Sequence, residues 1–130
     1  MSRRVRASVS LPSYINTDIL SSLKPIAWVG SSKRDLMASS PDVRRVAGRE
    51  LERVQRGADP TDWKPLASFG RGARQIRVHV GGELRVVYVA TFPEAVYVLH
   101  VFEKKTRKTS PRDLALGQQR YQSMMQGRRT

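Results

Sequence analysis

The spacing of apolar residues along the chain predicts three helices. Apolar positions between 41 and 57 recur every three or four residues, and Ser40-Pro41-Asp42 is a common start for such a helix. A similar pattern at Ser110-Pro111-Arg112-Asp113 predicts a last helix over 111–124. An approximate capping box predicts a shorter helix over 32–37.

Runs of β-branched and aromatic residues predict four strands, over 24–29, 73–80, 84–90 and 95–102. Turn residues between the last three runs predict tight hairpins. The proline-containing stretch 59–65 is expected to be a loop with an anchoring tryptophan. The order of elements predicts an α+β fold, in which a mainly antiparallel sheet of about four strands packs against two N-terminal helices and a C-terminal helix.

The register of the first hairpin decides which polar side chains share a face, because a slip by one residue exchanges the two faces. A turn made of Gly81-Gly82 alone would place Glu83 and Arg85 among the apolar side chains. We therefore expect a three-residue loop, 81–83, with Val80 opposite Leu84. The face opposite the core then carries Gln75, Arg77, His79 and Arg85.

The last predicted strand is apolar on both faces, which is typical of a central strand. Assigning Leu99 and Val101 to the core turns His100, Phe102 and Lys104 outward. An aromatic ring among cations suits RNA, because a base stacks on the ring while the cations neutralise phosphates. Our candidate site is therefore the face formed by Arg77, His79, Arg85, Phe102 and Lys104.

The length of 130 residues fits one domain, which we expect over 24–126. Residues 1–23 are rich in arginine and serine without a clear period, and they predict a disordered basic tail; residues 127–130 form a basic end. The longest apolar runs are too short to cross a bilayer, so we expect a cytoplasmic protein with no membrane partner.

The chain is strongly basic, with 24 Lys and Arg against 11 Asp and Glu and a formal charge of +13. Such a charge favours polyanions, and nucleic acid is the first expected partner. The alternatives are a basic, solvated surface that reflects composition alone, and a membrane surface. The chain has no cysteine and only two histidines without helical spacing, so we expect no metal site and no cofactor.

Several segments resemble the phage-derived, HigB-like toxins of the RelE/ParE superfamily. The resemblance covers about Lys24 to Met125, and its most specific part is Phe-x-Lys-Lys-Thr-x-Lys-Thr at 102–109, after a strand and before a helix. The other segments that carry it are 24–32, Trp63-Lys64-Pro65, 74–77, 84–89 and 97–101.

The resemblance implies a RelE-like fold and a toxin that cleaves mRNA in the ribosomal A site without a metal ion. It also implies a cognate antitoxin, expected to be a helix-turn-helix protein. Arg77 and Arg85 match arginines of two family strands, and Lys104 and Lys105 match a lysine pair. This chain departs from the family at Gln75, where an acidic residue is frequent, and at Leu84, where an aromatic is common; the departures concern rate and base preference more than fold.

Cleavage of RNA without a metal needs a base for the 2′-hydroxyl, a cation for the phosphorane and an acid for the 5′-oxygen. We assign Arg77 and Arg85 to the phosphate, and one of Lys104, His79 and His100 to proton transfer. Residues expected to bind RNA are Arg74, Phe102, Lys105, Arg107 and Lys108.

Other interpretations stay open for these residues. Arg85 could pair with Glu83 or Glu103, Arg77 could be a solvated strand residue, and Phe102 could pack on the last helix. ParE-like relatives share the fold but poison DNA gyrase without cleaving RNA, and a basic domain can bind nucleic acid without cutting it. A non-enzymatic toxin or nucleic-acid-binding protein is therefore the alternative function.

Overall fold

The computed structural model describes residues 23–129. The tail predicted for residues 1–23 lies, apart from its last residue, outside the described residues. The elements in chain order are β1 (Ile26–Trp28), α2 (Ser32–Met37), α3 (Pro41–Gln55), β2 (Trp63–Pro65), β3 (Ala73–Val78), β4 (Leu84–Val89), β5 (Val96–Glu103) and α4 (Pro111–Arg129). The α+β class and the three predicted helices are confirmed.

The sheet has five strands in the order β1-β5-β4-β3-β2, rather than about four. The additional strand is β2, which lies in the stretch predicted as a loop and pairs with β3 over Arg74–Ile76. An edge strand of three residues that ends in proline is too short to show the alternation by which a strand is recognised in a sequence. The sheet is also partly parallel, because β1 runs parallel to β5. Parallel pairing between β1 and β5, which are about 70 residues apart, leaves no local pattern from which the sequence could predict it.

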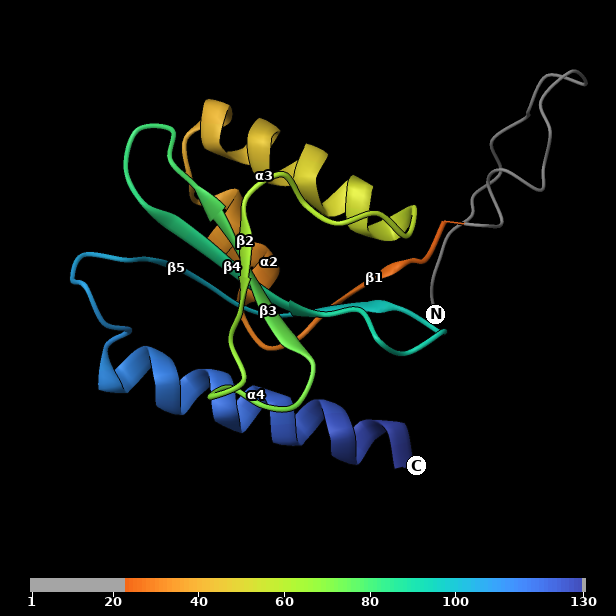
Figure 1. Ribbon diagram of the computed structural model, residues 1–130. Helices are drawn as coiled ribbons and strands as arrows, with labels where there is room; N and C mark the ends of the chain where they lie inside the picture. The colour runs from red at the N-terminus through yellow and green to blue at the C-terminus, as the bar shows by residue number, and fades with distance from the viewer. Residues whose placement is uncertain (1–22, 130) are drawn as a thin grey trace, which may run out of the picture.

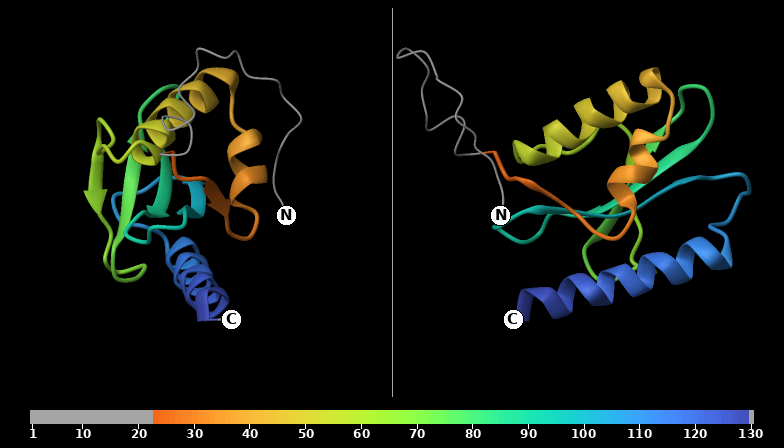
Figure 2. Two further views of the ribbon diagram at one scale, coloured as in Figure 1. Left: turned by 90° about the vertical axis from the view of Figure 1, so that its right-hand side faces the viewer. Right: turned by 180° about the vertical axis from the view of Figure 1, so that it is seen from behind.

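Two helices cover opposite faces of the sheet (Figure 1). The two further views show the same three layers, with α3 on one side and α4 on the other (Figure 2). The α3-side core contains Leu36, Val43, Ala47, Leu51, Val54, Ile76, Val78, Leu84, Val86, Tyr88, Val96, Val98 and Val101. The α4-side core contains Phe69, Ala73, Val87, Val89, Leu99, Phe102 and Met124.

The amphipathic pattern of α3 explains its position. Its four buried side chains, Val43, Ala47, Leu51 and Val54, recur at helical spacing and face the sheet. Complete burial of a leucine such as Leu51 contributes about 1.5–3 kcal/mol of transfer free energy. The arginines of α3 lie on its other faces, in contact with solvent or with nearby loops.

A glycine lets α4 pack closely against the loop before β3. A Cβ atom added to Gly117 would lie 1.9 Å from the ring of Phe69, which is fully buried. The hydroxyl of Tyr121 donates a hydrogen bond of 2.8 Å to the carbonyl of Arg71, so this tyrosine docks α4 against the same loop. The helix continues to Arg129, beyond the predicted end at 124, and no helix within the described residues is long and apolar enough to cross a membrane.

The register of the β3–β4 hairpin differs from the predicted one by two residues. Val78 pairs with Leu84, so the connection is the five-residue loop 79–83 rather than 81–83. Gly81 and Gly82 both have positive φ angles there, which glycine adopts without steric cost. Val80 lies in this loop with its side chain 39% exposed, and its predicted place in the core was wrong. A shift of two residues preserves the faces, so Arg77 and Arg85 still share one.

A bulge in β5 changes the predicted faces of that strand. Val87 pairs with His100 and Tyr88 with Val98, so Leu99 is the extra residue. Leu99 therefore belongs to the α4-side core, whereas Val101 belongs to the α3-side core. The prediction that His100 and Phe102 point outward was wrong, because both side chains are buried on the face that α4 covers.

Candidate functional site

The predicted site residues fall into two neighbouring groups. Arg77, His79 and Arg85 lie on the β3–β4 hairpin and its loop. The second group lies at the end of β5 and in the loop that leads to α4, and it contains His100, Phe102, Lys104, Lys105, Arg107 and Lys108. The two groups adjoin because Arg85 of β4 is the pairing partner of Phe102 of β5.

The first group forms a chain of alternating charges, which we name the hairpin charge network: Arg77, Asp62, His79, Glu83 and Arg85. An oxygen of Asp62 lies 2.6 Å from Nη2 of Arg77, and its other oxygen lies 2.7 Å from Nε2 of His79. Glu83 continues the chain, 2.9 Å from Nδ1 of His79 and 3.1 Å from Nη2 of Arg85. Each arginine of the network therefore has a carboxylate partner in the free protein.

The partners of His79 favour its charged form. Both ring nitrogens face carboxylates, which only accept hydrogen bonds, and the imidazolium is the form that donates from both nitrogens. These contacts raise the pKa of His79, chiefly through Glu83 and then through Asp62. In turn, His79 is the largest cause of the lowered pKa of both carboxyl groups.

Arg85 is the most buried cation of the network, with 8% of its surface exposed. In addition to its ion pair with Glu83, its guanidinium donates a hydrogen bond of 3.2 Å to the carbonyl of Leu84. Its Nε atom is buried and has no hydrogen-bond partner among the described residues. The pairing of Arg85 with Glu83, one of the interpretations left open by the sequence, is therefore present.

A pocket of about 660 Å³, the basic pocket, lies beside the second group. It is bounded by the end of β5, the loop after it, the start of α2 and the N-terminal half of α4. The acidic side chains that line it are Asp35, Glu103 and Asp113. The basic side chains that line it are Arg34, Lys104, Lys105, Lys108, Arg112 and Arg120. Cations outnumber carboxylates, so the pocket favours anions.

His100 lies at the wall of the basic pocket between two residues of α4. Its Nε2 lies 2.8 Å from an oxygen of Asp113, and its Nδ1 lies 3.0 Å from Nη1 of Arg120. Arginine can only donate hydrogen bonds, so Nδ1 accepts and the proton is on Nε2. Burial lowers the pKa of His100 against the opposing effect of Asp113, with Arg120 lowering it further. The contacts of the two histidines therefore favour the neutral form of His100 and the charged form of His79.

Arg120 joins three elements at the base of the pocket. Its Nη1 also donates to the carbonyl of Leu99 at 3.2 Å, and its Nη2 donates to Oγ of Ser31 at 2.9 Å. Gly30 makes room for the Arg120 side chain, because a Cβ atom at position 30 would lie 2.6 Å from Nε of Arg120. The φ angle of Gly30, 59°, is also in the left-handed region.

Two residues of this site, Asp113 and Arg120, were missed as functional candidates. Asp113 was recognised only as the acidic residue of a helix start, and Ser110 does donate to its carboxylate at 2.8 Å. The glycine at position 30 marks a close approach of another residue, although no local pattern identifies Arg120 as that residue.

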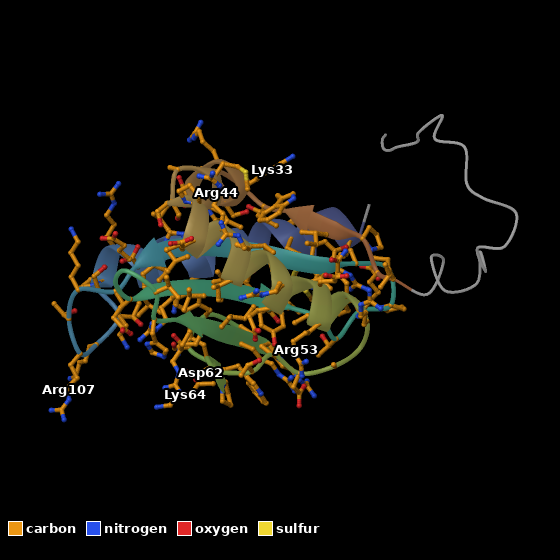
Figure 3. All side chains as sticks on the ribbon, turned by 90° about the horizontal axis from the view of Figure 1, so that it is seen from above. Lys33, Arg44, Arg53, Asp62, Lys64 and Arg107 are labelled. Carbon is orange, nitrogen blue, oxygen red and sulfur yellow. The ribbon has the colours of Figure 1, made fainter. Side chains whose placement is uncertain are left out.

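Phe102 packs in the core beneath the last helix, which is the alternative that the sequence left open. Its ring stacks on the imidazole of His100, with centroids 5.0 Å apart and planes at 21°. Since Phe102 is also buried in the α4-side core, it positions the histidine rather than offering an open stacking surface. By contrast, Lys105, Arg107 and Lys108 are exposed. Arg107 points away from the body of the protein at the tip of its loop (Figure 3).

Arg74 does not join the other predicted RNA-binding residues. Its guanidinium pairs with Asp59 at 3.0 Å and lies 4.1 Å from the ring centre of Trp63. It lines a separate, smaller pocket of about 150 Å³ together with Lys24 and Tyr88. Because Arg74 and Arg77 are separated by three positions along β3, they lie on opposite faces of the sheet.

The described part of the chain contains no group of three or more histidine and carboxylate side chains placed to hold a metal ion. The ionisable side chains of the candidate site are guanidinium and ammonium groups, carboxylates and two histidines whose partners favour opposite charge states.

Comparison with known proteins identifies the family. No curated protein sequence is significantly similar to this chain. The family model described as phage-derived protein Gp49-like matches residues 34–122, which is more than half of the chain. The match includes β2 to β5, the hairpin charge network and nearly all of the basic pocket. The chain therefore belongs to the phage-derived Gp49-like protein family.

Proposed function

We propose that this protein is the toxin of a type II toxin–antitoxin system and that it cleaves mRNA on the ribosome without a metal ion. The Gp49-like family to which it belongs is a family of RelE-like toxins. The observation that carries the enzymatic part of the proposal is the basic pocket, where a neutral, hydrogen-bonded histidine lies among six cationic side chains. Cytoplasmic mRNA and a cognate antitoxin, a helix-turn-helix protein, are the proposed partners.

Arg77 and Arg85 are proposed to bind the scissile phosphate. The two residues are directly paired across the sheet, and the present partners of their guanidinium groups are the carboxylates of Asp62 and Glu83. A phosphodiester offers the same kind of acceptor, so it would replace these carboxylates with charge-assisted hydrogen bonds of similar geometry. The hairpin charge network thus holds the two proposed phosphate-binding arginines in place before RNA binds.

The reaction needs one group to accept the proton of the 2′-hydroxyl and another to protonate the leaving 5′-oxygen. Lys104, His79 and His100 are the proposed proton-transfer residues. The exposed Lys105, Arg107 and Lys108 are proposed to contact phosphates of mRNA or ribosomal RNA, which position a complex without reading its sequence.

Primer extension on a reporter mRNA in a translating extract tests this function. The wild-type protein should produce cuts that depend on translation, and Arg85→Ala should lose them while it remains folded. Arg45→Ala is the matched control, since Arg45 is exposed on α3 and pairs with Asp42. Cuts of equal strength from Arg85→Ala would remove Arg85 from the site.

One observation favours the non-enzymatic alternative. Arg77, Arg85 and both ring nitrogens of each histidine already have protein partners, as expected for a surface that binds without reacting. The alternative is a ParE-like gyrase poison or a nucleic-acid-binding protein. Growth arrest with intact mRNA and altered DNA supercoiling would support it over the ribonuclease.

A further inference from the structure

We propose that His100 is the general base of the basic pocket, that Asp113 orients it, and that Arg120 caps its proton-accepting nitrogen until a phosphate draws the guanidinium away. This inference rests on the proposed ribonuclease function and specifies how its site works. It selects one proton acceptor among three candidates and adds two positioning residues from α4.

The choice between the two histidines follows from their contacts. A base needs a nitrogen lone pair, and the two carboxylates around His79 favour an imidazolium that has none. His100 has its lone pair on Nδ1, because Nδ1 accepts a hydrogen bond from Arg120. In this respect His79 is suited to donating a proton and His100 to accepting one.

Asp113 holds His100 in the tautomer that a base requires. One oxygen of Asp113 accepts the Nε2 proton of His100 at 2.8 Å, and the other accepts a hydrogen bond from Ser110, also at 2.8 Å. The backbone N–H of Asp113 donates back to Oγ of Ser110 at 3.1 Å, which fixes the start of α4. The carboxylate is therefore placed to stabilise the imidazolium that forms when Nδ1 takes up a proton.

Arg120 is suited to leaving its present position because its partners carry no charge. Its guanidinium donates to Nδ1 of His100, to the Leu99 carbonyl and to the Ser31 hydroxyl. A phosphate anion adds the attraction of opposite charges to its hydrogen bonds with a guanidinium, and the neutral partners of Arg120 do not supply this attraction. Arg120 lines the basic pocket, so a phosphodiester bound there competes for the guanidinium and uncovers Nδ1.

The proposed step balances in protons and bonds. The 2′-hydroxyl proton moves to Nδ1 of His100, the 2′-oxygen forms a bond to phosphorus, and the bond from phosphorus to the 5′-oxygen breaks. The 5′-oxygen takes a proton from a cationic side chain of the site. The products are a 2′,3′-cyclic phosphate and a 5′-hydroxyl end, and no metal or other co-reactant takes part.

The pH profile of single-turnover cleavage on programmed ribosomes tests the assignment. His100→Gln should lower the plateau rate by about 100-fold or more, which is the usual contribution of a general base. The charged groups that face His100 are Asp113 and Arg120 of α4, Asp35 of α2 and the lysines of the β5–α4 loop. Arg120→Met removes a nearby positive charge, so the acid limb of the profile should move to higher pH.

Two variants keep the test independent of folding defects. Asp113→Asn leaves the ring in place and should lower the rate by about tenfold or more. Arg120→Lys restores the charge and should return the acid limb toward the wild-type position. A His100→Gln rate equal to wild type, or an unmoved acid limb in Arg120→Met, overturns the inference and leaves the ribonuclease function standing. A wild-type protein that cuts nothing overturns both.

A measurement without turnover tests the cap directly. In protein labelled with ¹⁵N-histidine, the chemical shifts of His100 should report an unprotonated Nδ1. Binding of a single-stranded oligonucleotide with 2′-deoxyribose at the cleavage position should shift that signal as Arg120 moves to the phosphate. A protonated Nδ1 in the free protein, or a signal that stays unchanged at saturation, overturns the capping role.

Discussion

Arg77 of β3 and Arg85 of β4 face each other directly across the sheet. Like charges in facing positions destabilise a pair of strands, and here the carboxylates of Asp62 and Glu83 offset that repulsion. His79 joins the two carboxylates. The phosphate-binding arginines that we propose are thus held together by groups that a phosphate must displace.

Asp62→Asn should therefore have opposite effects on stability and on RNA affinity. Loss of the carboxylate removes the partner of Arg77 and one partner of His79, which should lower the free energy of unfolding by about 1 kcal/mol. The same change frees Arg77 for phosphate and should strengthen RNA binding. Urea denaturation measures the first effect, and fluorescence anisotropy with a labelled single-stranded RNA measures the second.

Asp42→Asn is the control for net charge in that experiment. It removes one carboxylate as well, but Asp42 is exposed on α3 and pairs with Arg45, outside the hairpin charge network. It should change RNA affinity less than Asp62→Asn. Equal gains in affinity from both variants would attribute the effect to total charge and would contradict a specific release of Arg77.

The stability supplied by His79 should depend on pH. Its folded-state pKa is raised above the ordinary value of 6.5 by Glu83 and Asp62. A histidine with a raised folded-state pKa contributes its full stabilisation when the pH is below its pKa in the unfolded chain. This contribution is lost as the pH rises through its folded-state pKa. The stability difference between wild type and His79→Gln should therefore be larger at about pH 6 than at about pH 9. Urea titrations at both pH values measure it, and a difference that grows toward alkaline pH would contradict the ion-paired state.

Alternation of side chains allowed the faces of β3 and β4 to be predicted even though the register was wrong. The error was two residues, the period of a strand, so Arg77 and Arg85 still fell on one face. His100 was assigned to the surface because the helix α4, which covers that face of β5, leaves no local pattern in the strand. The bulge at Leu99 adds a single residue, so Leu99 and Val101 lie on opposite faces although alternation predicts one face for both. An inserted residue of this kind depends on tertiary packing, which hydrophobic periodicity does not encode.

The composition of the site was predictable where residues follow one another in the chain and not where they meet through the fold. Lys104, Lys105 and Lys108 form a local run after β5, and their charge together with the resemblance over 102–109 identified them. The contact between His100 and Arg120 joins a strand to a helix across 20 positions. Arg74 shows the opposite error: it was grouped with Arg77 because the two are close in sequence, although they lie on opposite faces of the sheet.

Gly117→Ala should destabilise the protein although alanine favours helices. The added Cβ would lie 1.9 Å from the buried ring of Phe69, so either the ring or α4 must move. Such overpacking costs about 1–3 kcal/mol. Gly48→Ala in α3 is the matched control, since a Cβ there meets nothing within 4 Å, and it should stabilise the protein by about 0.5–1 kcal/mol. Thermal and urea unfolding compare the two, and equal effects would contradict the close packing of α4.

The two sides of the sheet should contribute differently to RNA binding. Lys105→Ala and Lys108→Ala each remove an exposed cation beside the basic pocket, and each should weaken RNA binding and reduce the slope of log affinity against log salt by about 1. Arg74→Ala removes an equal charge from the opposite face and should leave that slope nearly unchanged, because its guanidinium is engaged with Asp59 and Trp63. Binding isotherms at several salt concentrations measure all three slopes. Three equal reductions would mean that RNA senses only the total charge of the protein, and a reduction confined to Arg74→Ala would move the RNA to the α3 side of the sheet.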